Sequence, residues 1–291
     1  MPSTPVVVLD STLTNIANAI RAKTGGSATM TPGQMPAQIA SIPSGGGVGI
    51  PREVSAQGVF QMPSQSFSFS LPANVTDLGG RVLEYALGYS SGLTAVDMSS
   101  LTAVTGSYAL RNAFYNCTNL ATVDLGSLTT VTGRDAFTAA FLNCSSLTSV
   151  DLGSLTTASG LNALHQAFNG CSSLASVSIG SLASATGGSS LSMTFSGCTS
   201  LTSLTFTSLA NITGSAALSQ AFYGCTSLAS LSFPALTASS FGSSYTNQFN
   251  DMLSGVTGCT VHFPAAAQTK IETLIGYPNF GGTNTTVLFD L

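Results

Sequence analysis

The chain has 291 residues, of which 7 are Lys or Arg and 11 are Asp or Glu, so the formal net charge is −4. Charged residues make up 6% of the chain, whereas a typical soluble domain contains about 25%. With so few basic side chains, the surface has little with which to neutralise phosphates, and we expect no nucleic-acid partner. No apolar run approaches the ~18 residues that a transmembrane helix needs, so we expect no membrane span.

Residues 1–43 are predicted to form a small helical anchor module. The first helix ends at Gly25-Gly26, and the second begins at a capping box, Thr31-Pro-Gly-Gln34. A module of this length has too few apolar residues for a core of its own, so it needs a partner. It could instead lie on the rest of the chain as an N-terminal cap. The predicted anchor interface consists of the apolar residues at helical spacing: Leu13, Ile16, Ile20, Met35, Ile39 and Ile42.

Residues 44–65 are predicted to be a linker and lead-in segment, because Ser44-Gly-Gly-Gly-Val-Gly49 has the composition of a flexible chain. The first ten residues lack a basic stretch and contain Pro2 and Pro5, so we do not predict a secretory signal.

A repeat of 27 residues follows. Cysteines recur at this step, and leucine, phenylalanine and glycine positions keep the same step in the same register. Because no single repeat can bury its apolar side alone, the repeats must stack as the coils of a solenoid. The cysteines of the repeat are Cys117, Cys144, Cys171, Cys198 and Cys225.

One coil is predicted to contain a short strand, a turn and a short helix. Leu120, Val123 and Leu125 fit a strand, Gly133 breaks the chain, and Phe137 and Phe141 lie four residues apart, as on one side of a helix. We therefore predict an α/β repeat solenoid of about seven coils over residues 66–254. Residues 255–291 are predicted to be a C-terminal cap, with a helix at 265–275 and a closing strand at 285–290.

Two parts of the chain resemble known families. Ala140-Phe-Leu-Asn-Cys-Ser-Ser-Leu-Thr-Ser-Val-Asp-Leu152 resembles the BspA-like, or Treponema-type, leucine-rich repeat, which implies a right-handed solenoid and membership of a family rich in surface and adhesion proteins. The helical pair in residues 1–43 resembles a short module of phage and prophage tail and virion proteins. This second resemblance implies attachment to a larger particle.

We predict no catalytic residue, no metal site and no cofactor. His165 and His262 belong to no catalytic or metal-binding spacing, and His165 is expected to face solvent. The in-register cysteines could pair as disulfides or bind metal. However, every coil offers the same thiol, so we favour a ladder of reduced, buried cysteines.

The candidate binding residues form one column on the outer side of the predicted strands. Its aspartates repel each other at the spacing of stacked strands, and a cation such as Ca²⁺ would relieve that repulsion. The simpler alternative is that each carboxylate is solvated or bonded to a hydroxyl group. The column consists of Asp97, Asp124, Asp151, Ser178, Thr205 and Ser232.

Our leading functional prediction is a non-enzymatic phage virion protein, such as a tail-fibre, baseplate or capsid-fibre component. It would bind other virion proteins through residues 1–43, form a homo-oligomer in the assembly, and contact a host cell-surface glycan or protein. It would be made in the host cytoplasm and reside in the extracellular virion. The alternatives are a bacterial BspA-like surface adhesin and a purely architectural capsid or tail decoration protein.

Overall fold

The computed structural model describes residues 53–54, 60–61, 66–71, 73–242, 247–274 and 277–291. The predicted anchor module, including its six interface residues, lies outside these ranges, as does most of the predicted linker. Among the described residues, no helix has the length and apolar character needed to cross a membrane.

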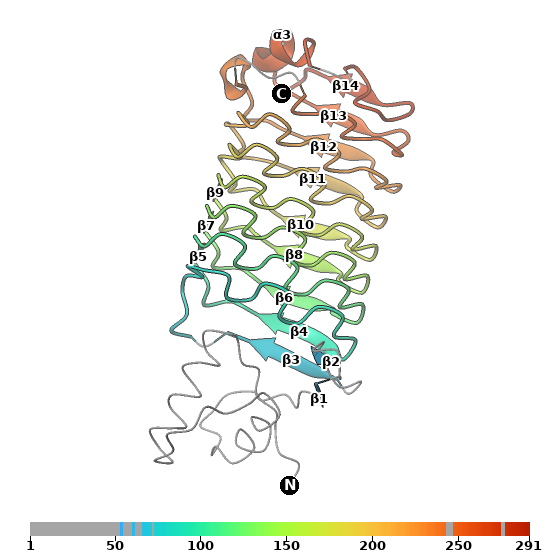
Figure 1. Cartoon of the computed structure of the whole chain (residues 1–291). Coiled ribbons are helices and arrows are strands. Elements are labelled where there is room, and N and C mark those ends of the chain that lie inside the picture. The colour runs from blue at the N-terminus through green and yellow to red at the C-terminus, as the bar shows by residue number, and fades with distance from the viewer. Residues whose placement is uncertain (1–52, 55–59, 62–65, 72, 243–246, 275–276) are drawn as a thin grey trace, which may run out of the picture.

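The described part is a solenoid whose parallel strands are stacked along the length of the molecule (Figure 1). The nine stacked strands of the described residues belong to two sheets and define about eight coils with a step close to 27 residues. The repeat solenoid predicted from the sequence is therefore confirmed. The first sheet contains β3 (Phe67–Ser70), β4 (Leu93–Asp97), β6 (Thr122–Asp124), β8 (Ser149–Asp151) and β10 (Ser176–Ser178), and the second contains β11 (Ser203–Thr205), β12 (Ser230–Ser232), β13 (Thr260–His262) and β14 (Thr286–Leu288).

Shorter strands flank this stack. A second edge of the coils carries β5 (Ala103–Val104), β7 (Thr130–Val131) and β9 (Thr157–Ala158), which pair in parallel. Isolated parallel bridges, such as Ser184 with Asn211, extend this edge into later coils. The antiparallel pair β1 (Glu53–Val54) and β2 (Phe60–Gln61) precedes the solenoid in sequence.

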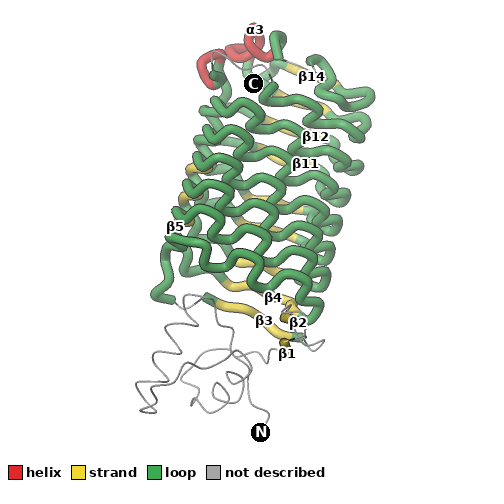
Figure 2. The backbone as a smooth tube through the Cα atoms, in the orientation of Figure 1, coloured by secondary structure: helices red, strands yellow, loops and turns green. Residues whose placement is uncertain are grey.

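The prediction of a short helix in every coil is wrong. Figure 2 shows the returning segments as loops and turns, with helix confined to the C-terminal end of the described chain. Amides of these segments alternate between two kinds of partner. The amide of Asn112 donates to Thr138 O of the next coil at 3.0 Å, whereas the amide of Ala113 donates to Leu110 O of its own coil at 3.0 Å. Hydrogen bonds between coils therefore replace the bonds of an α-helix.

The backbone explains why no helix forms there. Residues in the left-handed region recur at every fourth position, for example Tyr108, Asn112 and Asn116 with φ of 63°, 53° and 57°. A left-handed residue interrupts a right-handed helix. The α/β description of the fold is therefore not confirmed. The helical elements of the described residues are the 3-10 turns η1 (Ala238–Ser240) and η2 (Ala265–Ala267) and the single-turn helix α3 (Gln268–Ile271).

Ladders of identical apolar side chains fill the interior. Phe114 and Phe141 stack with ring centroids 5.0 Å apart, and Phe168 continues the stack 5.5 Å from Phe141. Leucines of successive coils, such as Leu120 and Leu147, are fully buried beside them. Each coil thus covers the apolar side of its neighbour, as stacking requires.

The predicted ladder of buried cysteines is confirmed. All six cysteines are free and buried. The thiol of Cys144 donates to the carbonyl oxygen of Phe114 at 3.2 Å, and the thiol of Cys225 donates to that of Phe195 at 3.0 Å. Burial raises the pKa of the Cys117 and Cys225 thiols to about 12, so the neutral thiol is the form that the fold accommodates.

The C-terminal residues contain the elements η2, α3 and β14 within the ranges where a helix and a closing strand were expected. β14 pairs in parallel with β13, with Val261 opposite Val287. The solenoid hydrogen bonding therefore continues into the segment predicted to be a cap.

Candidate functional site

The outer side of the main sheets presents short polar side chains. In β6, Val123 is buried while Thr122 and Asp124 on either side of it are exposed, as the alternation of a strand requires. β8 and β11 have the same pattern. This outer side, which we call the strand face, is therefore made of residues that the core does not use.

The six candidate residues predicted from the sequence form one column on the strand face. Parallel pairing places Asp97 opposite Asp124, Asp151 opposite Ser178, and Thr205 opposite Ser232. Five of the six are exposed and Ser232 is half-buried. The predicted outward orientation is confirmed, whereas a binding role for the column stays a prediction.

The aspartates of the column close the turns that follow their strands. The amide of Gly126 donates to Asp124 Oδ1 at 3.0 Å, and the amide of Gly153 donates to Asp151 Oδ1 at 2.8 Å. Asp97 Oδ1 accepts from both the hydroxyl and the amide of Ser99, and these bonds hold the pKa of Asp97 below its usual range. Each carboxylate thus has a structural partner of its own.

The described residues contain no group of three or more His, Cys, Asp or Glu side chains positioned to hold a metal ion. The aspartate column therefore does not have the converging ligands of a Ca²⁺ site. Hydrogen-bonded carboxylates at the ends of strands, the simpler of the two sequence-based alternatives, fit this geometry.

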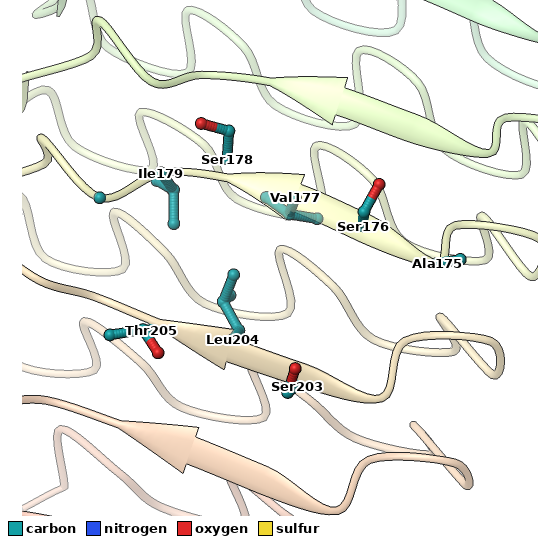
Figure 3. A pocket seen from close by; sticks show the side chains of 9 residues that line it. Ala175, Ser176, Val177, Ser178, Ile179, Ser203, Leu204 and Thr205 are labelled. Carbon is teal, nitrogen blue, oxygen red and sulfur yellow. The ribbon is translucent and has the colours of Figure 1, made fainter.

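Two open hollows lie on the strand face. One, of about 750 Å³, is lined by residues of β3, β4 and β6 and by Asp151. The other, of about 390 Å³, lies where β10 meets β11, with Ser178 and Thr205 on its two strands (Figure 3). The two sheets meet at this point, and Val177 there is half-buried, unlike the buried Val150 of the preceding strand. Both hollows are lined mainly by small side chains.

The two histidines do not come together in the structure. His165 is half-buried rather than facing solvent as predicted, and burial lowers its pKa. His262 lies on β13, in the column of Ser232, and its Nδ1 is 3.0 Å from the Asp290 carboxylate. The two histidines therefore lie on different coils, with different partners.

A cluster of aromatic and charged side chains that the sequence pattern did not predict lies on the turns of the first coils. We call it the tyrosine patch. Tyr85 and Tyr89 are 61% and 68% exposed, the largest exposures among the sizeable apolar side chains of the described residues. The signal in the sequence was that four of the seven tyrosines fall between positions 85 and 115. The patch consists of Arg81, Glu84, Tyr85, Tyr89, Tyr108, Arg111 and Tyr115.

Contacts between side chains order the tyrosine patch. The Arg81 guanidinium lies over the Tyr108 ring, 4.3 Å from its centroid, and that of Arg111 lies 5.4 Å from the same centroid. Tyr89 meets Tyr115 edge to face with centroids 5.1 Å apart. Hydrogen bonding with Tyr115 raises the pKa of the Tyr89 phenol. These contacts join two neighbouring coils into one surface.

The stacked coils with a polar outer strand face define a leucine-rich-repeat class of solenoid. Residues 57–184 and 85–218 match the family model described as a BspA type leucine rich repeat region, in six copies. Together these matches span more than half of the chain. The chain therefore belongs to the BspA-type leucine-rich-repeat family.

Two solved structures resemble this chain. A leucine-rich repeat protein from Bacteroides ovatus has 19% sequence identity over 82% of this chain and 75% of its own, with a TM-score of 0.28. A leucine rich cell surface protein from Faecalibacterium prausnitzii has 16% identity over 81% of this chain and 92% of its own, with a TM-score of 0.26. No curated protein matches the chain. The family assignment thus depends on the family model.

Proposed function

We propose that this protein is a non-enzymatic binding protein of the surface-adhesin type, which presents its solenoid to a partner on a cell surface. The observation that carries the proposal is the strand face, where exposed Ser, Thr and Asp side chains repeat in register from coil to coil. A polar surface that the core does not need, repeated over many coils, is the form in which solenoids bind extended partners.

The family supports the adhesin more than the phage virion protein that we predicted first. The BspA-type repeat is typical of surface and adhesion proteins, and its matches, at residues 57–184 and 85–218, cover the larger part of the solenoid. The virion prediction depended on residues 1–43, which lie outside the described residues, and no comparison supports it. The surface-adhesin alternative therefore becomes the main proposal.

The chemistry of the strand face also favours binding over catalysis. Its residues are mainly hydroxyl-bearing, and the aspartates among them are engaged with turn amides, as Asp124 is with Gly126. General acid–base catalysis needs a group held within reach of the reacting atoms with its pKa near the working pH. The aspartates Asp124 and Asp151 are instead held by the turns that follow their strands.

The test is binding of the purified full chain to whole cells. We would measure attachment of fluorescently labelled protein to cultured epithelial cells and to intact bacteria by flow cytometry. A triple variant, Ser149→Lys, Ser176→Lys and Ser203→Lys, places long charged side chains at exposed positions of the strand face. The control is Ser227→Lys, at an exposed position outside the strands.

We expect the full chain and Ser227→Lys to attach to at least one cell type, and the triple variant to lose at least tenfold in attachment. Circular dichroism would show that all three proteins are folded. Absence of attachment to every cell type, or equal attachment of the triple variant, would count against the strand face as the adhesive surface.

A further inference from the structure

The tyrosine patch places its rings on two adjacent coils. Positions one repeat apart lie next to each other, so Arg81 lies beside Tyr108 and Glu84 beside Arg111. The backbone confirms the pairing, because the amide of Tyr85 donates to Arg111 O at 3.0 Å. The tyrosine patch therefore spans two adjacent coils and lies outside the strands.

The backbone at three of the tyrosines is strained. Tyr85, Tyr89 and Tyr108 have φ of 56°, 61° and 63°, in the left-handed region that bulky residues avoid. One coil later, the positions equivalent to Tyr85 and Tyr89 are Asn112 and Asn116, and asparagine tolerates this region far better. In later coils the same two columns hold residues such as Gln166 and Gly170, also at positive φ, so the repeat itself imposes this backbone conformation.

Packing does not account for these rings. Tyr85 and Tyr89 are mostly exposed, so neither fills the core. Two large, mostly exposed rings that the core does not use therefore indicate a recognition surface.

The charges of the tyrosine patch leave one net positive charge. The Glu84 carboxylate lies 3.4 Å from the Arg81 guanidinium and 3.8 Å from that of Arg111, so one carboxylate faces two cations. On the next coil Arg134 pairs with Asp135 at 3.2 Å and adds no net charge. The Arg81 side chain is 64% exposed. Its remaining N–H groups can bind an incoming carboxylate in a bidentate manner.

The size and chemistry of the tyrosine patch fit a short chain of sugar rings better than a protein surface. A stable protein interface needs about 20–30 residues a side, whereas the patch has seven. A phenol ring offers a flat apolar face and a hydroxyl group. The C–H side of a sugar ring can lie on that face while its hydroxyl groups bond to the neighbouring polar groups.

We propose that the tyrosine patch binds an acidic oligosaccharide, with sugar rings on Tyr85 and Tyr89 and a sugar carboxylate at Arg81. The inference rests on the proposed adhesive function and names the ligand class and a second binding surface for it. The acidic sugar could be a uronic acid or a terminal sialic acid, since both present a carboxylate on a ring.

The experiment titrates the full chain by calorimetry with two acidic probes, tetragalacturonate and sialyllactose, and with two neutral probes, maltotetraose and lactose. The main variant is Tyr85→Asn/Tyr89→Asn, which should fold because asparagine is found at the equivalent positions of the next coil. A second variant, Arg81→Gln, removes the cation and keeps a polar side chain. The matched control is Tyr223→Asn, at an exposed tyrosine in the column of Tyr115, four coils later.

We expect at least one acidic probe to bind the full chain at least tenfold more tightly than its neutral counterpart. Binding should fall at least tenfold in Tyr85→Asn/Tyr89→Asn, with Tm unchanged or raised, and Arg81→Gln should lose the preference for the acidic probe. Tyr223→Asn should bind as the full chain does. Which acidic probe binds distinguishes the uronic from the sialic source.

The inference is overturned if neither acidic probe binds, if a neutral probe binds as well as its acidic counterpart, or if the double tyrosine variant keeps full affinity. Cell attachment separates this failure from failure of the proposed function. Attachment that persists in the tyrosine variant and disappears in the strand-face variant would leave the adhesive function standing without this ligand. Absence of attachment by the full chain would count against the proposed function itself.

Discussion

The thiol of Cys171 donates a hydrogen bond to the carbonyl oxygen of Phe141, one coil earlier, with 3.2 Å between Sγ and oxygen. The same oxygen accepts the amide of Cys144 within its own coil, also at 3.2 Å. Both lone pairs of a buried carbonyl are thus used, which matters because unpaired buried polar groups are costly. The cysteine column is therefore a bridge between coils as well as part of the apolar core.

Burial of this thiol predicts that the free energy of unfolding falls at high pH. Burial raises the pKa of Cys171 to about 12 from an ordinary value near 9.0, so the native state keeps its proton over a range in which the unfolded chain loses it. The contribution is complete below pH 9.0 and is lost as the pH rises from there towards about 12. Each such thiol should lower the free energy of unfolding by up to about 1.4 kcal/mol per pH unit in this window.

Urea denaturation of the full chain at several pH values between 7 and 11 would measure this loss. The double variant Cys171→Ala/Cys198→Ala should be less stable at pH 7, because it loses buried volume and two bridges between coils, but its stability should fall less steeply above pH 9.0. Equal slopes for the two proteins would show that the thiols do not cause the decline.

The phenylalanine stack predicts a large effect of truncation. The Phe168 ring is stacked between Phe141 at 5.5 Å and Phe195 at 6.0 Å and is fully buried. Phe168→Ala should lower the free energy of unfolding by about 3–5 kcal/mol, because the cavity lies between two coils that cannot both collapse into it. Tyr223→Ala, at an exposed ring, is the control and should change stability by less than about 0.5 kcal/mol in urea denaturation. A small effect at Phe168 would mean that the stack repacks.

The order of the strands could be predicted from the sequence because the apolar ladders share one step. Leu120 and Leu147 recur at equivalent places, and a short alternating stretch follows each of them. The returning segments could not be assigned from the same pattern. Phe137 and Phe141 are four residues apart, which suits a helix and equally suits a series of turns with one left-handed residue in four.

The residue types at the left-handed positions indicate a positive φ in some columns of the coils but do not by themselves exclude a helix. In one column of the coils, Asn116 and Asn143 are followed by Gly170, and both residue types favour positive φ. The strand-face residues were predictable from strand alternation alone. The tyrosine patch was not, because its coherence depends on which turn residues of neighbouring coils lie beside each other.

Gly133 and Gly160 lie one repeat apart, and their backbones are so close that not even one methyl group fits between them. A Cβ on Gly160 would overlap the carbonyl oxygen of Gly133 in the preceding coil, and this oxygen is a backbone atom that cannot turn aside. Gly160→Ala should therefore lower the free energy of unfolding by about 1–3 kcal/mol, since the coils must move apart locally. Gly80→Ala is the control, because a Cβ there has no neighbour within 4 Å. Thermal unfolding that is equally perturbed by both substitutions would contradict close contact as the cause.

In the aspartate column, we predict that the carbonyl-type oxygen of the side chain contributes more to the stability of the turn than its negative charge does. Asp151 Oδ1 accepts the amide of Gly153 at 2.8 Å, and an asparagine side chain offers the same acceptor at the same position. Asp151→Asn should leave the free energy of unfolding within about 0.5 kcal/mol of the wild type, whereas Asp151→Ala should lower it by about 1 kcal/mol, because the turn loses its hydrogen bond. Urea denaturation with and without added CaCl₂ would measure both. A Ca²⁺-dependent gain in stability that Asp151→Asn abolishes would show instead that the carboxylates hold a cation. If CaCl₂ gives no such gain in stability, the aspartates act as hydrogen-bond acceptors for the turns. The hydroxyl groups of the strand face then remain as the groups available for recognition.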